Sequence, residues 1–204
     1  MSACKSKQKA VETNSNDMEV NNSGEEFVYV ADRFADLQII RYQIPGWDKL
    51  NLEQKKLVYY LSQAGYSGRD IIWDQNYRYN LTIRTALEKI VSEYSGDKKT
   101  EEWTQFMTYM KRVWFSNGIH HHYSMDKFMP EFSREYFSGL LKSVNFELDE
   151  SIQDVMFNSS IDAKKVSLDA SKDLLLASAS NFYDADISEE EALAFYKSMM
   201  QNEN

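Results

Sequence analysis

Apolar residues recur every three or four positions over most of the chain after residue 50, which is the spacing of one face of an α-helix. The pattern predicts a mainly helical chain, with helices over 51–64, 69–76, 80–94, 100–114, 133–141, 148–157, 169–183 and 188–199. Polar residues that favour helix starts stand before several of these runs, namely Asn51 (with Gln54 three residues on), Asn80, Thr100, Ser133 and Ser188.

The same spacing predicts which side chains these helices bury. The first helix has an apolar stripe of Leu57, Tyr60, Leu61 and Ala64, and the last has Leu193, Phe195, Tyr196 and Met199. The two central helices carry the longest stripes, Ile83, Leu87, Ile90, Val91 and Tyr94, then Trp103, Phe106, Met107, Met110, Val113 and Trp114. In the short helix, Asp70 and Asp74 share a face, and we expect them to anchor the helix through partners such as Arg78.

The N-terminal part of the chain has a different pattern. The stretches 27–30 and 37–44 are rich in β-branched and aromatic residues, which predicts one to three short strands before the turn at Pro45 and Gly46. Residues 1–25 are polar and have no apolar period, so we expect a disordered tether there and a folded part over 26–204. The stretch 116–127 interrupts the helical period and predicts a loop.

Composition supports the helical prediction and narrows the function. The chain has 204 residues with only 7 Gly and 2 Pro, too few for the many tight turns of an all-β fold. A formal net charge of −9 argues against a nucleic-acid partner, because phosphate binding needs basic residues. No run approaches 18 apolar residues, so no transmembrane segment is predicted.

The sequence contains no glycine-rich phosphate loop, nucleophile elbow or HExxH helix, and the one Cys lies in the polar tail. The one dense chemical cluster is His120, His121, His122 and Tyr123. Adjacent residues point to alternating sides of an extended loop, so three neighbouring imidazoles seldom converge on one metal ion. Other interpretations stay open at this point: a solvated polar loop, a loop that lines a ligand cleft, or an interface.

Three stretches, 34–84, 112–137 and 181–196, resemble the N-terminal region of bacterial dipeptidyl peptidase III. The resemblance covers roughly residues 26–200 and is carried by long unusual strings, GRDIIWDQN and NGIHHHYS, in the same order at matching separations. Members of this family are two-lobed zinc enzymes that release dipeptides from the N-termini of short peptides. The resemblance implies that this chain is the helical portion of the lower lobe.

In the family, zinc is bound in the upper lobe by an HExxGH helix and a later motif that contains Glu, and this sequence has neither. The resemblance therefore implies a zinc enzyme whose metal ligands lie outside this chain, and a chain that is inactive alone. Its partners would be the peptide substrate and the C-terminal part of the same enzyme. The alternative is a non-catalytic helical interaction module derived from such an enzyme.

The resemblance also implies candidate site residues. In family members, the loop before a Lys-Phe-x-Pro element contributes to the pocket for the N-terminal part of the peptide. Here that element begins at Lys127, and the matching loop residues are His122, Tyr123 and Ser124. These three are the predicted substrate contacts; no catalytic or metal-binding residue is predicted in this chain.

The extreme N-terminus resembles the end of a bacterial lipoprotein signal. Ser2, Ala3 and Cys4 are followed by a basic, polar stretch. This resemblance implies lipidation of Cys4 and a location at the cell envelope of a Gram-negative bacterium. The alternative is an ordinary thiol in the tail of a cytoplasmic enzyme.

Overall fold

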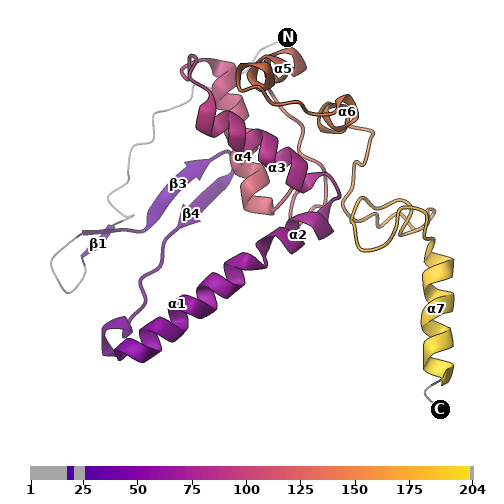
Figure 1. The fold of residues 1–204 in the computed structure, drawn as a ribbon, viewed down its shortest axis with the longest axis horizontal. Helices are drawn as coiled ribbons and strands as arrows, with labels where there is room; N and C mark the ends of the chain where they lie inside the picture. Colours follow the sequence, from indigo (N-terminus) through magenta and orange to yellow (C-terminus); the bar gives the residue numbers. More distant parts are fainter. Residues whose placement is uncertain (1–17, 21–25, 203–204) are drawn as a thin grey trace, which may run out of the picture. The chain divides into compact units, whose positions relative to one another are not determined.

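The structure, a computed structural model, describes residues 18–20 and 26–202, which fall into two compact units, 1–55 and 56–204. The first unit contains two antiparallel two-stranded sheets, β1 with β2 and β3 with β4 (Figure 1). Their bounds are β1 (Met18–Val20), β2 (Glu26–Val28), β3 (Val30–Phe34) and β4 (Leu37–Ile40). A 3₁₀ turn, η2 (Trp47–Lys49), follows Gly46, whose φ of 86° places it in the left-handed region.

The predicted short strands before Pro45 are thus present, but there are four in the described residues instead of one to three. The extra strand is β1, which lies inside the predicted tether and pairs Met18 with Val28. Its sequence, MEV, is too short to carry a strand signal of its own, and the pairing with β2 supplies its hydrogen bonds. The rest of the predicted tether, including Cys4, lies outside the described residues.

Helices account for about half of the described residues, so the fold is α-rich with short strands near the N-terminus. Helix α1 crosses the boundary between the two units, and the others belong to the second unit. The bounds are α1 (Leu52–Ser67), α2 (Arg69–Asn76), α3 (Asn80–Glu93), α4 (Glu101–Ser116), α5 (Arg134–Ser143), α6 (Glu150–Phe157) and α7 (Glu189–Asn202). None of these helices is both long and apolar enough to cross a bilayer.

The core of the second unit lies between α3, α4, α5 and α6, where α3 runs beside α4 (Figure 1). The predicted stripes of the two central helices are confirmed at their main positions, with Ile83, Leu87, Ile90, Phe106, Met110 and Val113 fully buried. Phe132 joins them to the later helices, because its ring contacts Phe106, Tyr109, Phe137 and Phe157. Burying each such side chain stabilises the fold by roughly 1.5–3 kcal/mol.

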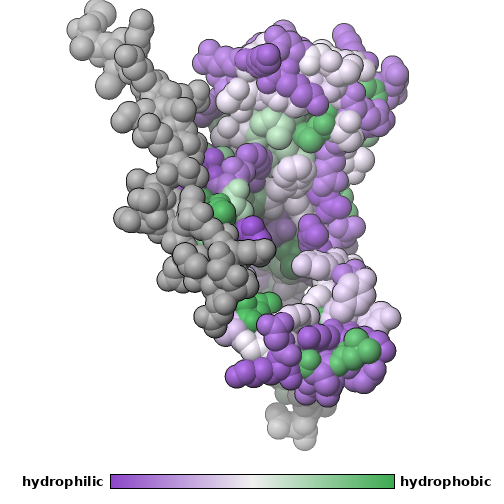
Figure 2. Space-filling view, turned by 90° about the vertical axis from the view of Figure 1, so that its left-hand side faces the viewer, coloured by the Kyte–Doolittle hydropathy of each residue, from purple (hydrophilic) through white to green (hydrophobic). Residues whose placement is uncertain are grey.

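The predicted buried stripes of the first and last helices are wrong. Leu57 is 60% exposed and Phe195 is 62% exposed, and no residue of α1 is buried. The three-and-four spacing gives each helix an apolar face, but it does not say what covers that face. In the space-filling view, apolar patches interrupt a largely hydrophilic surface (Figure 2).

The predicted capping contacts are largely confirmed. The hydroxyl oxygens of Thr100 and Ser133 accept hydrogen bonds from backbone N–H groups at the starts of α4 and α5. Asn51 and Gln54 form a reciprocal capping box, with N···O distances of 3.0 and 2.9 Å. Ser188 makes the equivalent contacts with Glu191 at the start of α7.

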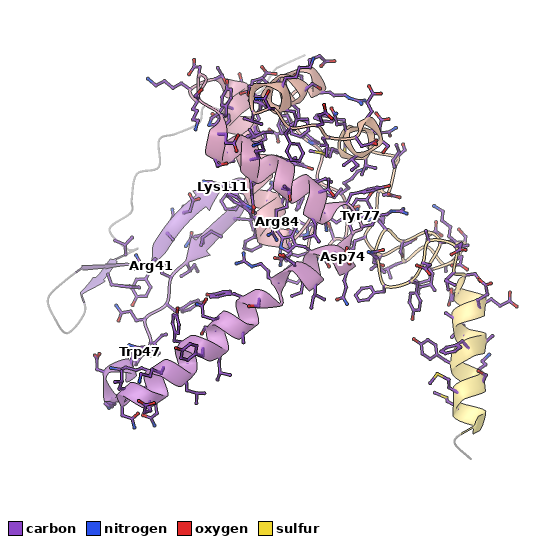
Figure 3. All side chains as sticks on the ribbon, viewed as in Figure 1. Arg41, Trp47, Asp74, Tyr77, Arg84 and Lys111 are labelled. Carbon is purple, nitrogen blue, oxygen red and sulfur yellow. The ribbon has the colours of Figure 1, made fainter. Side chains whose placement is uncertain are left out.

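Two other local predictions are corrected. The stretch 169–183 contains turns instead of a helix, because Asp169 and Asp173 accept hydrogen bonds from nearby backbone N–H groups and so compete with helix formation. The partner of Asp70 is Arg84, not Arg78, at 2.8 Å; the Arg84 guanidinium also lies 5.1 Å from the centre of the Trp73 ring (Figure 3).

The prediction that Asn80 caps α3 is wrong. Asn80 is instead a buried residue whose side chain joins two other segments of the chain. It is the first residue of α3, and its side-chain amide donates to the Trp73 carbonyl at 3.0 Å. Its side-chain oxygen accepts from the backbone N–H of Ile119 at 3.1 Å. Gly118 lies against this amide with φ of 147°, and an added Cβ would stand 2.2 Å from the Asn80 side-chain nitrogen. Only glycine fits this position without moving Asn80.

We therefore predict that Gly118→Ala lowers the free energy of unfolding by roughly 2–3 kcal/mol, because it strains the backbone and displaces buried hydrogen bonds. Gly139→Ala is the matched control, since this glycine is in α5 and an added Cβ meets nothing within 4 Å. The control should be about 0.5–1 kcal/mol more stable than wild type. Urea unfolding of the three proteins measures both effects, and equal stability of Gly118→Ala and wild type would contradict the clash.

Candidate functional site

The predicted loop after α4 is a narrow hairpin. Asn117 ends the helix with φ of 51°, and the chain then turns back so that His120 pairs with Lys127. The backbone N–H of Phe128 donates to the Ile119 carbonyl at 2.8 Å, and that of His121 donates to the Asp126 carbonyl at 2.7 Å. These hydrogen bonds fix residues 121–126 as the tip of the hairpin.

A segment far along the sequence holds the other edge of this hairpin. The backbone N–H of Lys127 donates to the Ala163 carbonyl at 3.0 Å, and that of Lys165 donates to the Met125 carbonyl at 2.8 Å. The Lys127 side chain is buried and donates to the carbonyls of Val155, Asn158 and Ile161. Because these carbonyls lie at or beyond the C-terminal end of α6, the lysine ties the hairpin to that helix.

His120 is the buried member of the His triplet. Its side chain is 2% exposed, and its Nε2 lies 2.8 Å from the Asp162 carbonyl oxygen. A carbonyl only accepts, so Nε2 carries the proton, and the buried Nδ1 has no hydrogen-bond partner. Burial, together with the positive charges of Lys127 and Lys165, lowers the pKa of His120 to about 4, although the hydrogen bond to the Asp162 carbonyl raises it. His120 is therefore a neutral structural residue at neutral pH.

The other two histidines lie nearer the surface. Nδ1 of His121 accepts hydrogen bonds from the backbone N–H groups of Tyr123 and Ser124. The His122 ring stacks on His121 at a centroid distance of 4.5 Å, and its Nδ1 lies 3.4 Å from the hydroxyl oxygen of Ser116. Each of the three rings thus has a separate set of contacts, and they do not converge on a common point for a metal ion. Across the described residues, no group of three or more His, Cys, Asp or Glu side chains could hold a metal.

Tyr123 and Ser124 line a hollow of about 460 Å³. Tyr123 is 82% exposed, and its ring lies 4.4 Å from that of His122. The opposite lining comes from the segment after α6, including Lys164, Val166, Ser167, Leu168, Asp169 and Lys172. Tyr123 and Ser124 therefore share one hollow, whereas His122 supports the Tyr123 ring from beside it and is not in the lining.

The segment 164–172 was not predicted as part of a site. Residues 169–172 belong to the helix predicted over 169–183, and no motif marks the segment, so the sequence carries no signal that it returns to the hairpin. From the break in helical period we also expect residues 118–125 to lie at the surface, and the structure corrects this expectation in part. Gly118, Ile119 and His120 are buried, because they connect the hairpin to the core, and only the tip is accessible.

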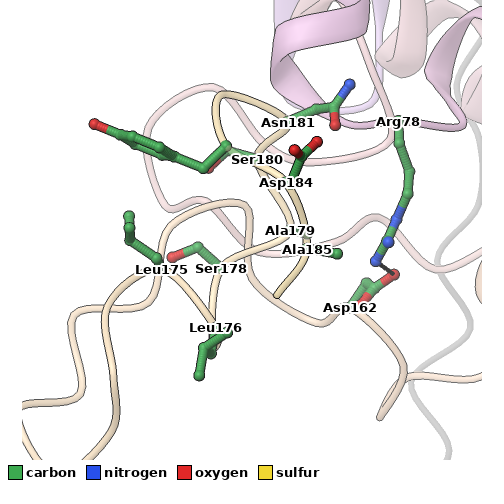
Figure 4. Close-up of a pocket in the computed structure, with 11 residues that line it drawn as sticks. Arg78, Asp162, Leu175, Leu176, Ser178, Ala179, Ser180, Asn181, Asp184 and Ala185 are labelled. Atoms are coloured by element: carbon green, nitrogen blue, oxygen red, sulfur yellow. Dashed lines mark ion pairs between the residues drawn. The ribbon is translucent and has the colours of Figure 1, made fainter. Parts of the chain in front are cut away.

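A second hollow, of about 80 Å³, lies beside Arg78 and Asp162 (Figure 4). The two side chains form an ion pair at 3.7 Å, and the Tyr77 hydroxyl donates to the same carboxylate at 2.6 Å. Burial raises the pKa of Tyr77 far above its ordinary value, so the phenol stays protonated. Arg78 and Tyr77 both bind the Asp162 carboxylate, and we assign these three side chains a structural role.

The stretches 34–84, 112–137 and 181–196 are joined by hydrogen bonds in the structure. The Asn76 side chain, in the first stretch, donates to the Asn117 carbonyl in the second at 3.0 Å. The backbone N–H of Asn181, which opens the third stretch, donates to the Gln75 carbonyl at 2.9 Å. Comparison with known proteins found no family model and no curated protein that matches this sequence.

The buried neutral His120 predicts a pH-dependent stability. Its pKa falls from 6.5 to about 4 on folding, so the unfolded chain binds more protons between these values. The stabilisation is complete above pH 6.5 and is lost as the pH falls towards 4. This residue should contribute a loss of about 2 kcal/mol between pH 7.5 and pH 5.

His120→Gln is the control for this prediction, because its amide can still donate to the Asp162 carbonyl but does not titrate. Both proteins contain the same carboxylates, so the difference between their urea-unfolding free energies isolates the histidine. If wild type and variant lose equal stability between pH 7.5 and pH 5, His120 is not held neutral by burial.

Proposed function

We propose that this chain is the N-terminal, substrate-binding portion of the lower lobe of a zinc-dependent dipeptidyl peptidase. The observation that carries the proposal is the meeting of the three resembling stretches around Gln75 and Asn76. These hydrogen bonds join the three stretches in one framework, and this framework presents the hairpin tip.

The chemistry of the hairpin tip suits a peptide. Tyr123 offers a flat, exposed ring and a phenol, and Ser124 offers an exposed hydroxyl beside it. The hollow next to them also has apolar lining from Val166 and Leu168. Apolar walls with a few polar groups are typical of sites that bind and orient a ligand. In the proposed enzyme, these residues hold the N-terminal half of the peptide and exclude water from it.

Zinc, held by residues outside this chain, would polarise the scissile carbonyl and activate water. The side chains described above take no part in that step, and this chain assayed alone with added zinc should release no dipeptide. A chelator-sensitive release of dipeptide by the chain alone would contradict the proposal. The role left to this chain is substrate binding and orientation.

We predict that Tyr123→Ala, in the enzyme that contains this chain, raises KM and lowers kcat/KM by roughly 5- to 30-fold. Loss of one packing and hydrogen-bonding contact costs on the order of 1–2 kcal/mol, and KM rises because the contact acts in the ground state and the transition state alike. Tyr123→Phe keeps the ring, so it separates the contribution of the phenol from that of packing.

Zinc content is measured on the same proteins and on His122→Ala. The proposal predicts full zinc occupancy in all of them, because the metal is held elsewhere. Loss of zinc from His122→Ala would support the metal interpretation of the histidines instead. Kinetic constants of Tyr123→Ala within about twofold of wild type would rule out the loop as a peptide-binding element.

A separate proposal concerns location. We propose that Cys4 is lipidated and holds the protein at the cell envelope, on the basis of the Ser-Ala-Cys-Lys stretch and the polar residues that follow it. In the native organism, wild type should be found in the membrane fraction and Cys4→Ala in the soluble fraction. Equal soluble fractions of the two proteins would end the lipoprotein proposal in favour of a cytoplasmic enzyme.

A further inference from the structure

The turn at the hairpin tip is built on the side chain of His121. Its Nδ1 lies 3.1 Å from the backbone nitrogen of Tyr123 and 3.1 Å from that of Ser124. Both backbone N–H groups donate, so Nδ1 must accept and cannot carry a proton. The turn therefore requires a neutral imidazole whose proton is on Nε2.

An Asn or Asp side chain usually occupies this position in a turn, because its oxygen reaches the N–H groups two and three residues later. In histidine, Nδ1 is separated from Cα by the same number of bonds as the Asn side-chain oxygen, so it can replace that oxygen. The difference is that histidine changes charge between pH 5 and pH 8, whereas Asn does not titrate. A protonated Nδ1 would face two N–H donors that it can no longer accept.

Titratable groups lie beside the His121 ring. The side chain is half-buried, with Asp126 across the turn and His122 stacked on the ring. Asp126 attracts a charged imidazole, but it is paired at 2.5 Å with Lys164 from the neighbouring segment, which offsets that attraction.

The remaining neighbours of the imidazole carry no carboxylate that would fix its charge. The rings of Phe128 and Tyr123 lie 5.7 and 6.4 Å from it, centre to centre. From α4, Arg112 lies over the same Phe128 ring at 5.5 Å and disfavours a second positive charge nearby. Among these described contacts, the two backbone N–H groups require the neutral imidazole, and a charged imidazole would lose both of them.

We propose that His121 is a positioning residue with a pH-dependent action. While it is neutral, it holds the backbone of Tyr123 and Ser124 at the edge of the hollow, and its protonation releases both. A consequence, which rests on the proposed function, is that peptide binding at this loop weakens in acid. The backbone release itself does not depend on that function and can be tested without substrate.

The first experiment measures solvent exchange of the Tyr123 and Ser124 amide protons by NMR on the full 204-residue chain between pH 8 and pH 5. After correction for intrinsic exchange, both amides should lose roughly 5- to 10-fold protection, since each hydrogen bond contributes on the order of 1 kcal/mol. The loss should follow the same midpoint as the His121 ring signals.

Two variants make the test specific. His121→Asn restores an acceptor that does not titrate, so protection should persist at every pH. His121→Phe keeps a ring against Phe128 but has no acceptor, so protection should be absent at every pH. Core amides, such as those of Phe106 and Met110, should be unchanged in both variants, which verifies that they fold. Protection in wild type that does not vary with pH, or normal protection in His121→Phe, would overturn the proposal.

The second experiment measures KM of the enzyme that contains this chain. The ratio of wild-type KM to that of His121→Asn should rise roughly 5- to 10-fold between pH 8 and pH 5, because only the wild-type turn opens. Dividing the wild-type KM by the KM of His121→Asn cancels the effect of pH on all other groups, because both proteins contain them. If the amides are released as proposed but this ratio stays constant, the positioning role of His121 stands and the peptide-binding role of the loop fails.

Discussion

The buried side chain of Asn80 is the contact on which the presentation of the hairpin depends. One amide group joins the end of α2, the start of α3 and the residue after Gly118, through hydrogen bonds to the Trp73 carbonyl and the Ile119 N–H. Removing it would leave the buried Ile119 N–H without a partner, at a cost of about 1–3 kcal/mol, and the Trp73 carbonyl would keep only the N–H of Tyr77. Gly118 is required because only its bare Cα fits beside this amide.

This arrangement separates the hairpin into a rigid base and an adjustable tip. At the base, His120 and Lys127 point inwards and bond to backbone carbonyls, so the core and α6 hold the two strands together. At the tip, Nδ1 of His121 accepts from the N–H groups of Tyr123 and Ser124, and the His121 carbonyl accepts from the N–H of Met125. Three adjacent histidines therefore have three different roles: one anchors, one shapes the turn and one supports the exposed Tyr123 ring.

The hollow beside Tyr123 depends on a contact between residues that are far apart in the sequence. Its second wall comes from residues 164–172, which return to the hairpin because Lys165 and Met125 share a backbone hydrogen bond. The turns of that segment form because Asp169 and Asp173 bind nearby backbone N–H groups, and a helix over 169–183 would replace those turns. Short-range side-chain chemistry thus decides the shape of a site formed by residues far apart in sequence.

The sequence alone determined the helical class, the helices from α2 to α6 and the core stripes of α3 and α4, because the three-and-four period and the capping residues are local signals. It also marked His122, Tyr123 and Ser124 as candidate substrate contacts, which stays a prediction; of these, Tyr123 and Ser124 share one hollow. Tertiary structure decided the rest. The amphipathic period of α1 and α7 does not distinguish a covered face from an exposed one. The type of residue at position 80 also does not distinguish a cap from a buried contact, because both use the hydrogen-bonding side-chain amide of Asn. The roles of the three histidines depended on which backbone groups lie around each ring, and residues distant in sequence supply most of those groups.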